Sequence, residues 1–421
     1  MDELRGNAFF QSRWVVGCYL ACAFAMLVYT STVRHHGKNI WDYDTRCWYT
    51  AGTCWWNGES PHDSGNYTRT WTSLYGEPPR DQATFVYPPT MAVICLPLAV
   101  LPWETAAWTF RITNLLAVMG GCFLIARLTS NALDQYPLLG RAGWYVGACA
   151  LLGSISQAIF QGQCSPVVVL GCLATWYGFQ RRVLWIFLLG FVVASIKPQI
   201  SMIPLLYILF SGGVRWFSYG AILSAGFSAL MLLTVPVPGF FAAFCESMEH
   251  HLTYQIFNSW DWYSSVPALL GATPWGKQFM ILGVVIGIVG ALWIARCQLE
   301  MEDTLYNRVR HQQLIWIVAM AAMPIHIYDL TGQAFIITTL WAIPGWSRRA
   351  IVIVSMLLGT KAFTVAYYIG AAGAPSSFVA LVQAQWMSVA SLVMLFCFCF
   401  WYVRDFRSKK PAPAHPNDVM A

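Results

Sequence analysis

Long apolar segments separated by short polar connections run along almost the whole chain. A helix needs about 20 predominantly apolar residues to cross a bilayer, and many segments approach that length. They are Trp14–Val33, Tyr87–Pro102, Ala107–Ala126, Ala142–Phe160, Pro166–Phe179, Val183–Ile196, Ile200–Phe210, Trp216–Val235, Phe279–Ala295, Leu314–Ile327, Leu330–Ile343, Ala350–Ile369 and Phe378–Val403. The pattern predicts an all-α polytopic membrane protein with about 11 to 13 transmembrane helices.

Several of these segments are short or interrupted by proline. Pro88 and Pro89 open one of them, and Lys197-Pro198 separates two others. Interrupted spans in membrane proteins usually line a cavity instead of facing lipid. We therefore expect a cavity within the helical bundle.

Composition supports a membrane protein and excludes two other classes. Of the 421 residues, 57% are hydrophobic and only 10% are charged, whereas soluble domains carry about 25% charged residues. The net charge of +6 does not indicate a nucleic-acid-binding protein, because no basic run is interleaved with aromatic residues. The excess of Lys and Arg is typical of loops on the cytoplasmic side of a membrane.

Basic loops predict the orientation. Arg181-Arg182, the loop 296–311, Arg348-Arg349 and the segment 404–410 read as cytoplasmic. The long polar segments 34–86 and 236–277 are then external. The spans before the second loop are one too many for this arrangement, unless Ala142–Phe179 forms one broken, partly re-entrant unit. Fusing Val183–Phe210 also corrects the count, but it moves Arg181-Arg182 outside.

One transmembrane domain, residues 1–410, accounts for nearly the whole chain. The polar N-terminal stretch lacks the pattern of a cleaved signal, so Trp14–Val33 reads as a retained helix. The Pro-rich tail 411–421 is expected to be disordered and cytoplasmic.

The first external loop has an unusual composition. From Trp41 to His62 it holds three acids, two cysteines and six tryptophan or tyrosine residues. An amphipathic helix in the membrane interface is predicted to begin at Asp44, with Asp42 just before it. Partial desolvation there would raise the pKa of a carboxylate and improve it as a base. The alternative is that Asp42 and Asp44 are only helix caps or solvated charges.

A transferase on the external face has no nucleotide pool and needs a donor carried in the lipid. Such a donor requires a base for the acceptor hydroxyl, a cation or imidazole for the departing phosphate, and an apolar groove. Asp44 is the candidate base and Asp42 its reserve. Lys197 and His326 are the main phosphate candidates, since charged groups within the membrane are costly and usually functional. Lys197 could instead snorkel to the interface, and His326 could be a core imidazole paired with Asp329.

Three further groups of residues each have more than one interpretation. His250 and His251 in the second external loop are alternative phosphate contacts. Gln161-Gly162-Gln163 is a polar turn between apolar segments that could bind substrate or merely connect helices. Cys47 and Cys54 could form a disulfide in an oxidising compartment, or could remain thiols.

The order of these features resembles glycosyltransferase family 87, the polyprenol-phosphate-mannose-dependent, mannosyltransferase-like membrane proteins of the GT-C fold. The resemblance covers the first half of the chain and adds Tyr87 to the candidate substrate-binding residues. The motifs that carry it are Asp44 with Tyr49 and Ala51, Gly58–Asp63, Phe85–Pro89, Leu96–Pro102, Trp108, Asn114, the turn Gln161–Gln163 and Ile196–Pro198. In the second half the stretch Met323–Asp329 departs from the family pattern, and Asp329 stands where the family's histidine is expected.

The resemblance implies an inverting, single-step transfer of a hexose from a polyprenyl-phosphate sugar. Mannose is the hexose that the resemblance favours. Asp44 would take the proton from an acceptor hydroxyl on an envelope glycolipid or glycan. No nucleotide, metal or other cofactor is expected, and the site would face outside the inner or plasma membrane. The alternatives are a membrane transporter, which would place ionisable groups at an inverted-repeat interface near the midplane, and a non-catalytic scaffold of envelope-glycan assembly.

Overall fold

The computed structural model describes residues 43–79, 85–129, 138–150, 152–232, 242–246, 276–301, 303–323, 327–340, 347–353 and most of 393–404, with a few isolated positions. Asp42, His250, His251 and His326 lie outside the described residues, as do the tail 411–421 and most of the first predicted span. Wherever the structure describes regular backbone, that backbone is helical. The predicted all-α class is confirmed.

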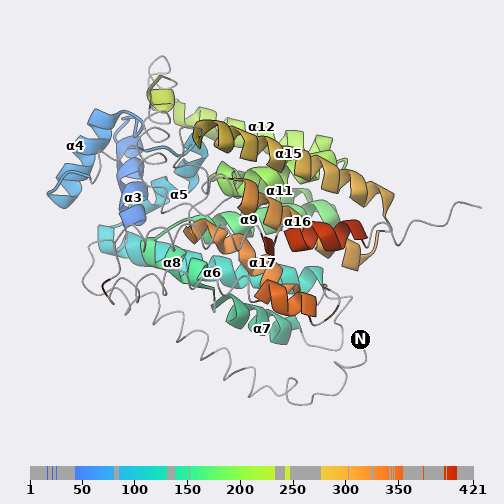
Figure 1. Cartoon of the computed structure of the whole chain (residues 1–421). Helices are drawn as coiled ribbons and strands as arrows, with labels where there is room; N and C mark the ends of the chain where they lie inside the picture. The colour runs from blue at the N-terminus through green and yellow to red at the C-terminus, as the bar shows by residue number, and fades with distance from the viewer. Residues whose placement is uncertain are drawn as a thin grey trace, which may run out of the picture.

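Fifteen helical segments of the described residues are numbered in chain order, and Figure 1 labels most of them. They are α3 (Tyr43–Trp56), α4 (Ser64–Tyr75), η3 (Pro89–Met91), α5 (Ala92–Ala99), α6 (Trp103–Leu128), α7 (Leu138–Ala150), α8 (Gly153–Gln161), α9 (Ser165–Arg181), α10 (Leu184–Ala194), α11 (Pro198–Phe210), α12 (Val214–Leu232), α15 (Gly276–Glu300), α16 (Leu305–Ala322), η7 (Ile327–Gly332) and α17 (Gln333–Thr338).

Two helices in the described part are long and apolar enough to cross a membrane by themselves. These are α6 and, within α15, Ile281–Glu300. A third crossing is formed if α7 and α8 count as one span, although the two helices are bent by 76°. The segments Pro89–Ala99, α10 and α11 are apolar but shorter. The chain is a membrane protein, while the total of 11 to 13 spans stays a prediction.

The interrupted spans expected from the prolines are present. Pro198 occupies the first turn of α11, where its missing N–H costs nothing, and the chain bends at Lys197 just before it. The stretch Ala142–Phe179, predicted to be one broken unit, consists of α7, α8 and α9. Its second break is at Gly162, whose φ of +70° is the left-handed conformation that favours glycine.

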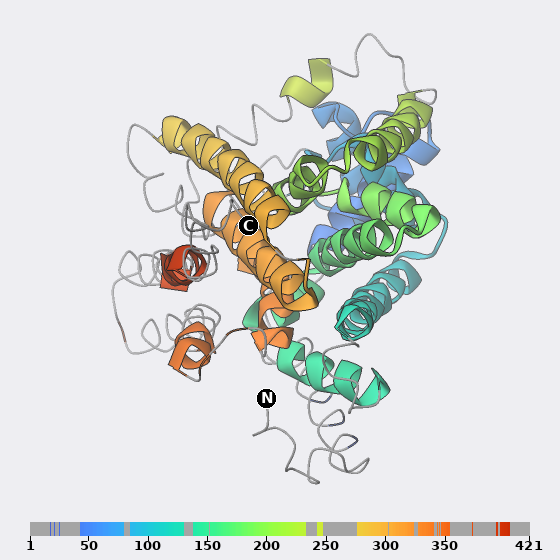
Figure 2. The ribbon, with the colours of Figure 1, turned by 90° about the vertical axis from the view of Figure 1, so that its right-hand side faces the viewer.

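Helix α9 lies at the centre of the described bundle. It packs against α10, α6 and α11, and the contact with α10 brings the two backbones together. A side chain at Gly171 of α9 or Gly190 of α10 would collide with backbone atoms of the facing helix. On the far side α15 and α16 lie side by side (Figure 2).

Helices α3 and α4 of the polar segment 34–86 lie at one end of this bundle, with α3 against α5 (Figure 1). Asp63 caps α4 by accepting a hydrogen bond from the backbone of Asn66, and Gly76 ends it in the left-handed conformation. Helix α3 begins at Tyr43, close to the predicted start at Asp44. It is packed into protein, since Trp48 and Trp55 are buried and only Trp56 is well exposed.

The structure also bears on the predicted cysteine pair. Cys47 and Cys54 are both free and lie seven residues apart on α3. At 1.5 Å per residue their Cα atoms are about 10 Å apart, beyond the ~7 Å that a disulfide can bridge. A disulfide between these two residues is therefore incompatible with this helix.

Candidate functional site

The polar turn between α8 and α9 forms the floor of the candidate site. Gln161 ends α8, Gly162 turns the chain, and Ser165 opens α9 with Pro166 in the first turn. A side chain on Gly162 would collide with Thr45 of α3. Only glycine at this position allows helix α3 to pack this closely against the turn.

Helix α3 is fastened to this turn by Trp48. The indole Nε1–H of Trp48 donates a 2.8 Å hydrogen bond to the carbonyl of Gly162, and its ring meets Tyr87 edge to face at 4.4 Å. Asp44 lies one helical turn before Trp48, and residues four apart share a face of a helix. The face of α3 that docks on the turn is therefore the face that carries Asp44.

Lys197 reaches the same turn from the break between α10 and α11. Its Nζ donates to Asp329 Oδ1 at 2.5 Å, to Gln163 Oε1 at 2.9 Å and to Ser165 Oγ at 3.2 Å. The Ser165 hydroxyl in turn donates to Asp329 Oδ1 at 2.6 Å. Lys197 and Asp329 have no exposed side-chain surface, so the pair is a buried ion pair with its hydrogen bonds well satisfied.

Asp329 comes from η7, which is distant from Lys197 along the chain but packs against α8 and α9. Gly332, at the end of η7, lies against the ring of Trp316 in α16, where a side chain would collide. This contact holds η7 against α16 and so positions Asp329.

The Asp44 carboxyl lies within electrostatic range of this ion pair. Burial raises the pKa of Asp44 from 3.8 to about 7; the Lys197 ammonium and the nearby Gln163 amide lower it, and the Asp329 charge raises it. The amide oxygen of Gln163 accepts a hydrogen bond from Lys197. Its amide nitrogen is buried and has no hydrogen-bond partner among the described residues.

His62 connects the segment 34–86 to the segment 242–246. Its Nδ1 bonds to the carbonyl of Phe85 at 2.8 Å, and its ring contacts Phe244, within 242–246, at 5.1 Å. Burial lowers the pKa of His62 to about 4, although the bond to Phe85 opposes this. At neutral pH His62 is therefore an uncharged structural residue.

Five residues predicted from the sequence come together in one cluster: Asp44, Tyr87, Gln163, Lys197 and Asp329. The Lys197 ammonium lies 5.9 Å from the centre of the Tyr87 ring. Gln161 lies in the same turn and is buried, and its Oε1 has no hydrogen-bond partner among the described residues. Lys197 does not snorkel to the interface, because it is fully buried and paired.

Two members of the site escaped the sequence analysis. Ser165 bridges Lys197 and Asp329, and Trp48 fixes α3. A serine directly before a proline, next to the Gln-Gly-Gln turn, was a signal for Ser165. Trp48 carried no signal that separated it from its five neighbouring aromatic residues.

This arrangement provides a proton acceptor beside a fixed positive charge. The ammonium of Lys197 and the carboxylate of Asp329 offset each other, which leaves Asp44 as the carboxyl whose protonation can change near neutral pH. A base with a pKa near the working pH is suited to general acid–base catalysis.

Residues 85–324 match the family described as glycosyltransferase family 87, over more than half of the 421 residues. The chain belongs to glycosyltransferase family 87. The resemblance seen in the sequence is thereby confirmed, and the protein is a membrane glycosyltransferase. No curated protein matches the chain significantly.

The region that matches family 87 contains some residues of the candidate site but not all of them. Tyr87, Gln163, Ser165 and Lys197 fall inside the matched region, whereas Asp44 precedes it and Asp329 follows it. The membership establishes the reaction class. The residues that perform the reaction are assigned below from the geometry.

Proposed function

We propose that this glycosyltransferase moves a hexose, with mannose as the first candidate, from a polyprenyl-phosphate sugar to a glycolipid or glycan of the cell envelope on the external face. The observation that carries the proposal is the position of Asp44, whose raised pKa and fixed neighbours suit a base. A sugar donor and an acceptor follow from the family. Their identities are part of the proposal.

Asp44 acts as the general base. It accepts the proton of an acceptor hydroxyl while that oxygen attacks the anomeric carbon and the bond to the donor phosphate breaks. A single displacement inverts the anomeric centre, so a β-linked donor gives an α-glycoside, and the polyprenyl phosphate leaves as an anion. Asp42 remains the reserve base.

Lys197 supplies positive charge to this step. Its ammonium is enclosed by Asp329, Gln163 and Ser165, so in this structure its effect on Asp44 is electrostatic. Contact of Lys197 with the donor phosphate stays a prediction, as do phosphate contacts of His250, His251 and His326. Tyr87, Gln161 and Gln163 are proposed to bind the sugar.

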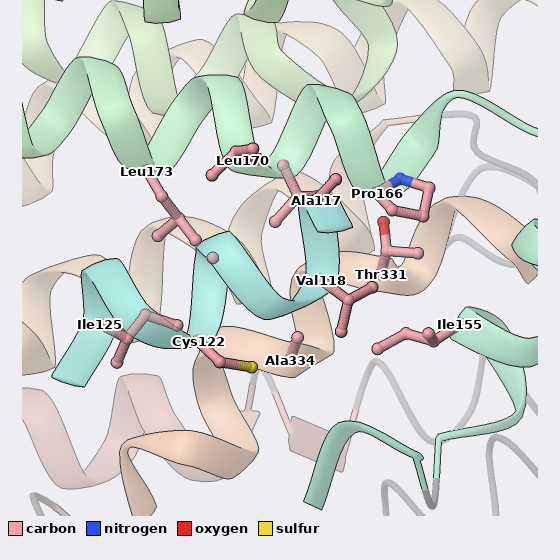
Figure 3. Close-up of a pocket in the computed structure, with 12 residues that line it drawn as sticks. Ala117, Val118, Cys122, Ile125, Ile155, Pro166, Leu170, Leu173, Thr331 and Ala334 are labelled. Carbon is pink, nitrogen blue, oxygen red and sulfur yellow. The ribbon is translucent and has the colours of Figure 1, made fainter. Parts of the chain in front are cut away.

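An apolar crevice beside the cluster suits the lipid part of the donor. Figure 3 shows Pro166, which follows Ser165, and Thr331, which follows Asp329 by two residues, at the same edge of this crevice. The rest of the lining comes from α6, α8, α9 and α17. The neighbouring outer face of α6 exposes Leu116 and Met119, which supports access from lipid.

No nucleotide, metal or other cofactor is expected in this reaction, because the phosphate of the donor leaves as a stable anion. This expectation stays a prediction. It is tested by assaying transfer with and without a strong chelator in the same buffer.

The decisive experiment is transfer in proteoliposomes supplied with a polyprenyl-phosphate hexose. We expect Asp44→Asn to lower the rate about 10²- to 10⁴-fold, the range for losing a general base, with no loss of thermal stability. Asp63→Asn is the matched control. It makes the same chemical change in the same loop at a helix cap that Asn also satisfies.

Full activity in both Asp44→Asn and Asp42→Asn would rule out the proposed base. Substrate-stimulated flux in the same liposomes without a covalent product would instead support the transporter alternative. Mass spectrometry of envelope glycans and glycolipids from a deletion strain identifies the acceptor.

A further inference from the structure

A second polar hollow lies at the opposite end of helix α9 from the candidate active site. It has a cavity volume of about 100 Å³ and is lined by Leu128, Trp176, Gln180, Arg181, Leu305 and Arg308. Arg181 ends α9, and Ser165 of the active site begins it. At 1.5 Å per residue the two positions are about 24 Å apart, close to the thickness of a bilayer core.

Positive charge converges on this hollow from two helices. Arg181 has no ion-pair partner among the described residues, and it extends from the last turn of α9. Arg308 extends from the first turns of α16, whose N-terminus adds the partial positive charge of a helix dipole. The amide of Gln180 is a further possible donor on the same wall.

Arg308 is not fully committed to other groups. It forms an ion pair with Asp303, in which its Nη1 contacts both carboxylate oxygens at 3.1 and 3.2 Å. The Asp303 side chain is 72% exposed, and exposed pairs contribute little stability. A guanidinium carries five N–H donors, so Nε and Nη2 remain available to a ligand.

The lining combines these donors with apolar walls. Trp176 is 4% exposed and packs edge to face against Phe335, and Leu128 and Leu305 complete the hydrophobic side. A planar guanidinium pairs best with phosphate or carboxylate oxygens in a forked geometry. Apolar walls beside two such groups fit a phosphate that carries a hydrophobic substituent better than a free ion.

We propose that the hollow formed by Arg181, Gln180 and Arg308 binds a phosphate group, and that this group is the headgroup phosphate of an anionic lipid. The site is separate from the sugar-transfer site and does not depend on it. If the active site faces outward, the hollow lies among the headgroups of the cytoplasmic leaflet, where short basic loops are expected.

The test uses the full chain in nanodiscs of phosphatidylcholine, with and without phosphatidylglycerol, and counts retained lipid by native mass spectrometry. Arg181→Gln/Arg308→Gln is the test variant. We expect retention of phosphatidylglycerol to fall about 100-fold in affinity, roughly tenfold for each charge-assisted pair removed. Arg296→Gln is the matched control, because Arg296 is an exposed arginine of α15 outside the hollow.

A second arm separates the two sources of phosphate. Inorganic phosphate is titrated into phosphatidylcholine nanodiscs, and its binding is measured by calorimetry. Binding of inorganic phosphate that is lost in the double variant keeps the site but assigns it to a free ion. Lys at both positions keeps the charge but not the forked geometry, so it should restore part of the binding. Thermal unfolding of the glutamine variant shows whether it is folded.

Two outcomes overturn the proposal. One is equal retention of phosphatidylglycerol by the wild type and a double variant with normal thermal stability. The other is an equal loss in Arg296→Gln, which would mean that the effect is a general one of surface charge. Sugar transfer is measured in parallel, so a failure of the lipid site is distinguishable from a failure of the proposed enzymatic activity.

Discussion

The two ends of helix α9 differ in how completely their charged groups are paired and buried. At the Ser165 end, Lys197 and Asp329 are buried and share hydrogen bonds with Ser165 and Gln163. At the Arg181 end, the guanidinium groups border an open hollow, and their acidic partner Asp303 is exposed. The same helix therefore carries a fully paired polar cluster and an incompletely neutralised one.

The difference shows where charge stabilises the fold and where it remains available for binding. A buried ion pair holds its surroundings in place because a lone buried charge is costly. An exposed pair contributes little stability and exchanges its partners easily. The first end is built for a fixed geometry, and the second for a ligand.

The largest expected effect comes from breaking the buried pair. Lys197→Met leaves Asp329 as an uncompensated buried charge, and loss of one partner typically costs about 3–5 kcal/mol of unfolding free energy. The combination Lys197→Met/Asp329→Leu removes both charges and should recover most of that loss. Thermal unfolding of the detergent-solubilised variants measures both effects.

A double variant no more stable than Lys197→Met would contradict this view of the pair. Transfer activity separates the roles further, since the double variant should fold but lack the positive charge beside Asp44. Recovery of stability together with full activity would remove Lys197 from the mechanism.

The next effect is on the pH dependence of transfer. The pKa of Asp44 is raised to about 7, so the base form should increase about tenfold between pH 6 and pH 8 and the rate should follow it. Stability should change in the opposite direction. The folded state holds a proton that the unfolded chain loses near pH 4, so raising the pH from about 4 to 7 destabilises the fold.

The measurements are initial rates and unfolding midpoints over the same pH series. Lys197→Met/Asp329→Leu sharpens the test: losing Lys197 raises the pKa of Asp44, losing Asp329 lowers it, and Lys197 is the larger influence. The inflection in the rate should therefore move to higher pH. A flat profile in the wild type would contradict the assignment of Asp44 as the titrating base.

The smallest expected effect lies at the other end of α9. Asp303→Asn removes an exposed partner of Arg308 and should change the unfolding free energy by less than about 1 kcal/mol. The same change releases Nη1 of Arg308, so binding of phosphatidylglycerol should become tighter by a few-fold. Lipid retention and thermal unfolding of one sample report both. Weaker lipid binding in Asp303→Asn would contradict an anion site.

The sequence predicted the composition of the candidate cluster better than its architecture. Lys197, Gln163 and Asp329 stood out because charged and amide groups are rare and costly within or between apolar segments. Asp44 stood out because it lies in a polar loop rich in acids and aromatic residues. The link between Lys197 and Asp329 did not, because residues 132 positions apart meet only through the packing of η7 on α8 and α9. The sequence paired Asp329 with His326 instead, and His326 lies outside the described residues.

Helix positions followed the same logic. Prolines and glycines marked the breaks at Lys197 and Gly162 correctly, because their backbone preferences are local. The burial of α3 was not predicted. Its mixture of polar and aromatic residues resembles an interfacial helix. The burial of Trp48 and Trp55 and the hydrogen bond from Trp48 to Gly162 show that it packs against the rest of the protein.

The anchoring of α3 by Trp48 has a consequence for the timing of catalysis. In the proposed mechanism the base is held near Lys197 before any substrate arrives, so the entropy of bringing the two groups together is lost once, during folding, and not in every turnover. A substrate then needs to order only itself. Loosening this anchor would lower the effective concentration of the base and reduce the burial that raises its pKa, so turnover would slow and the inflection in its pH dependence would move to lower pH.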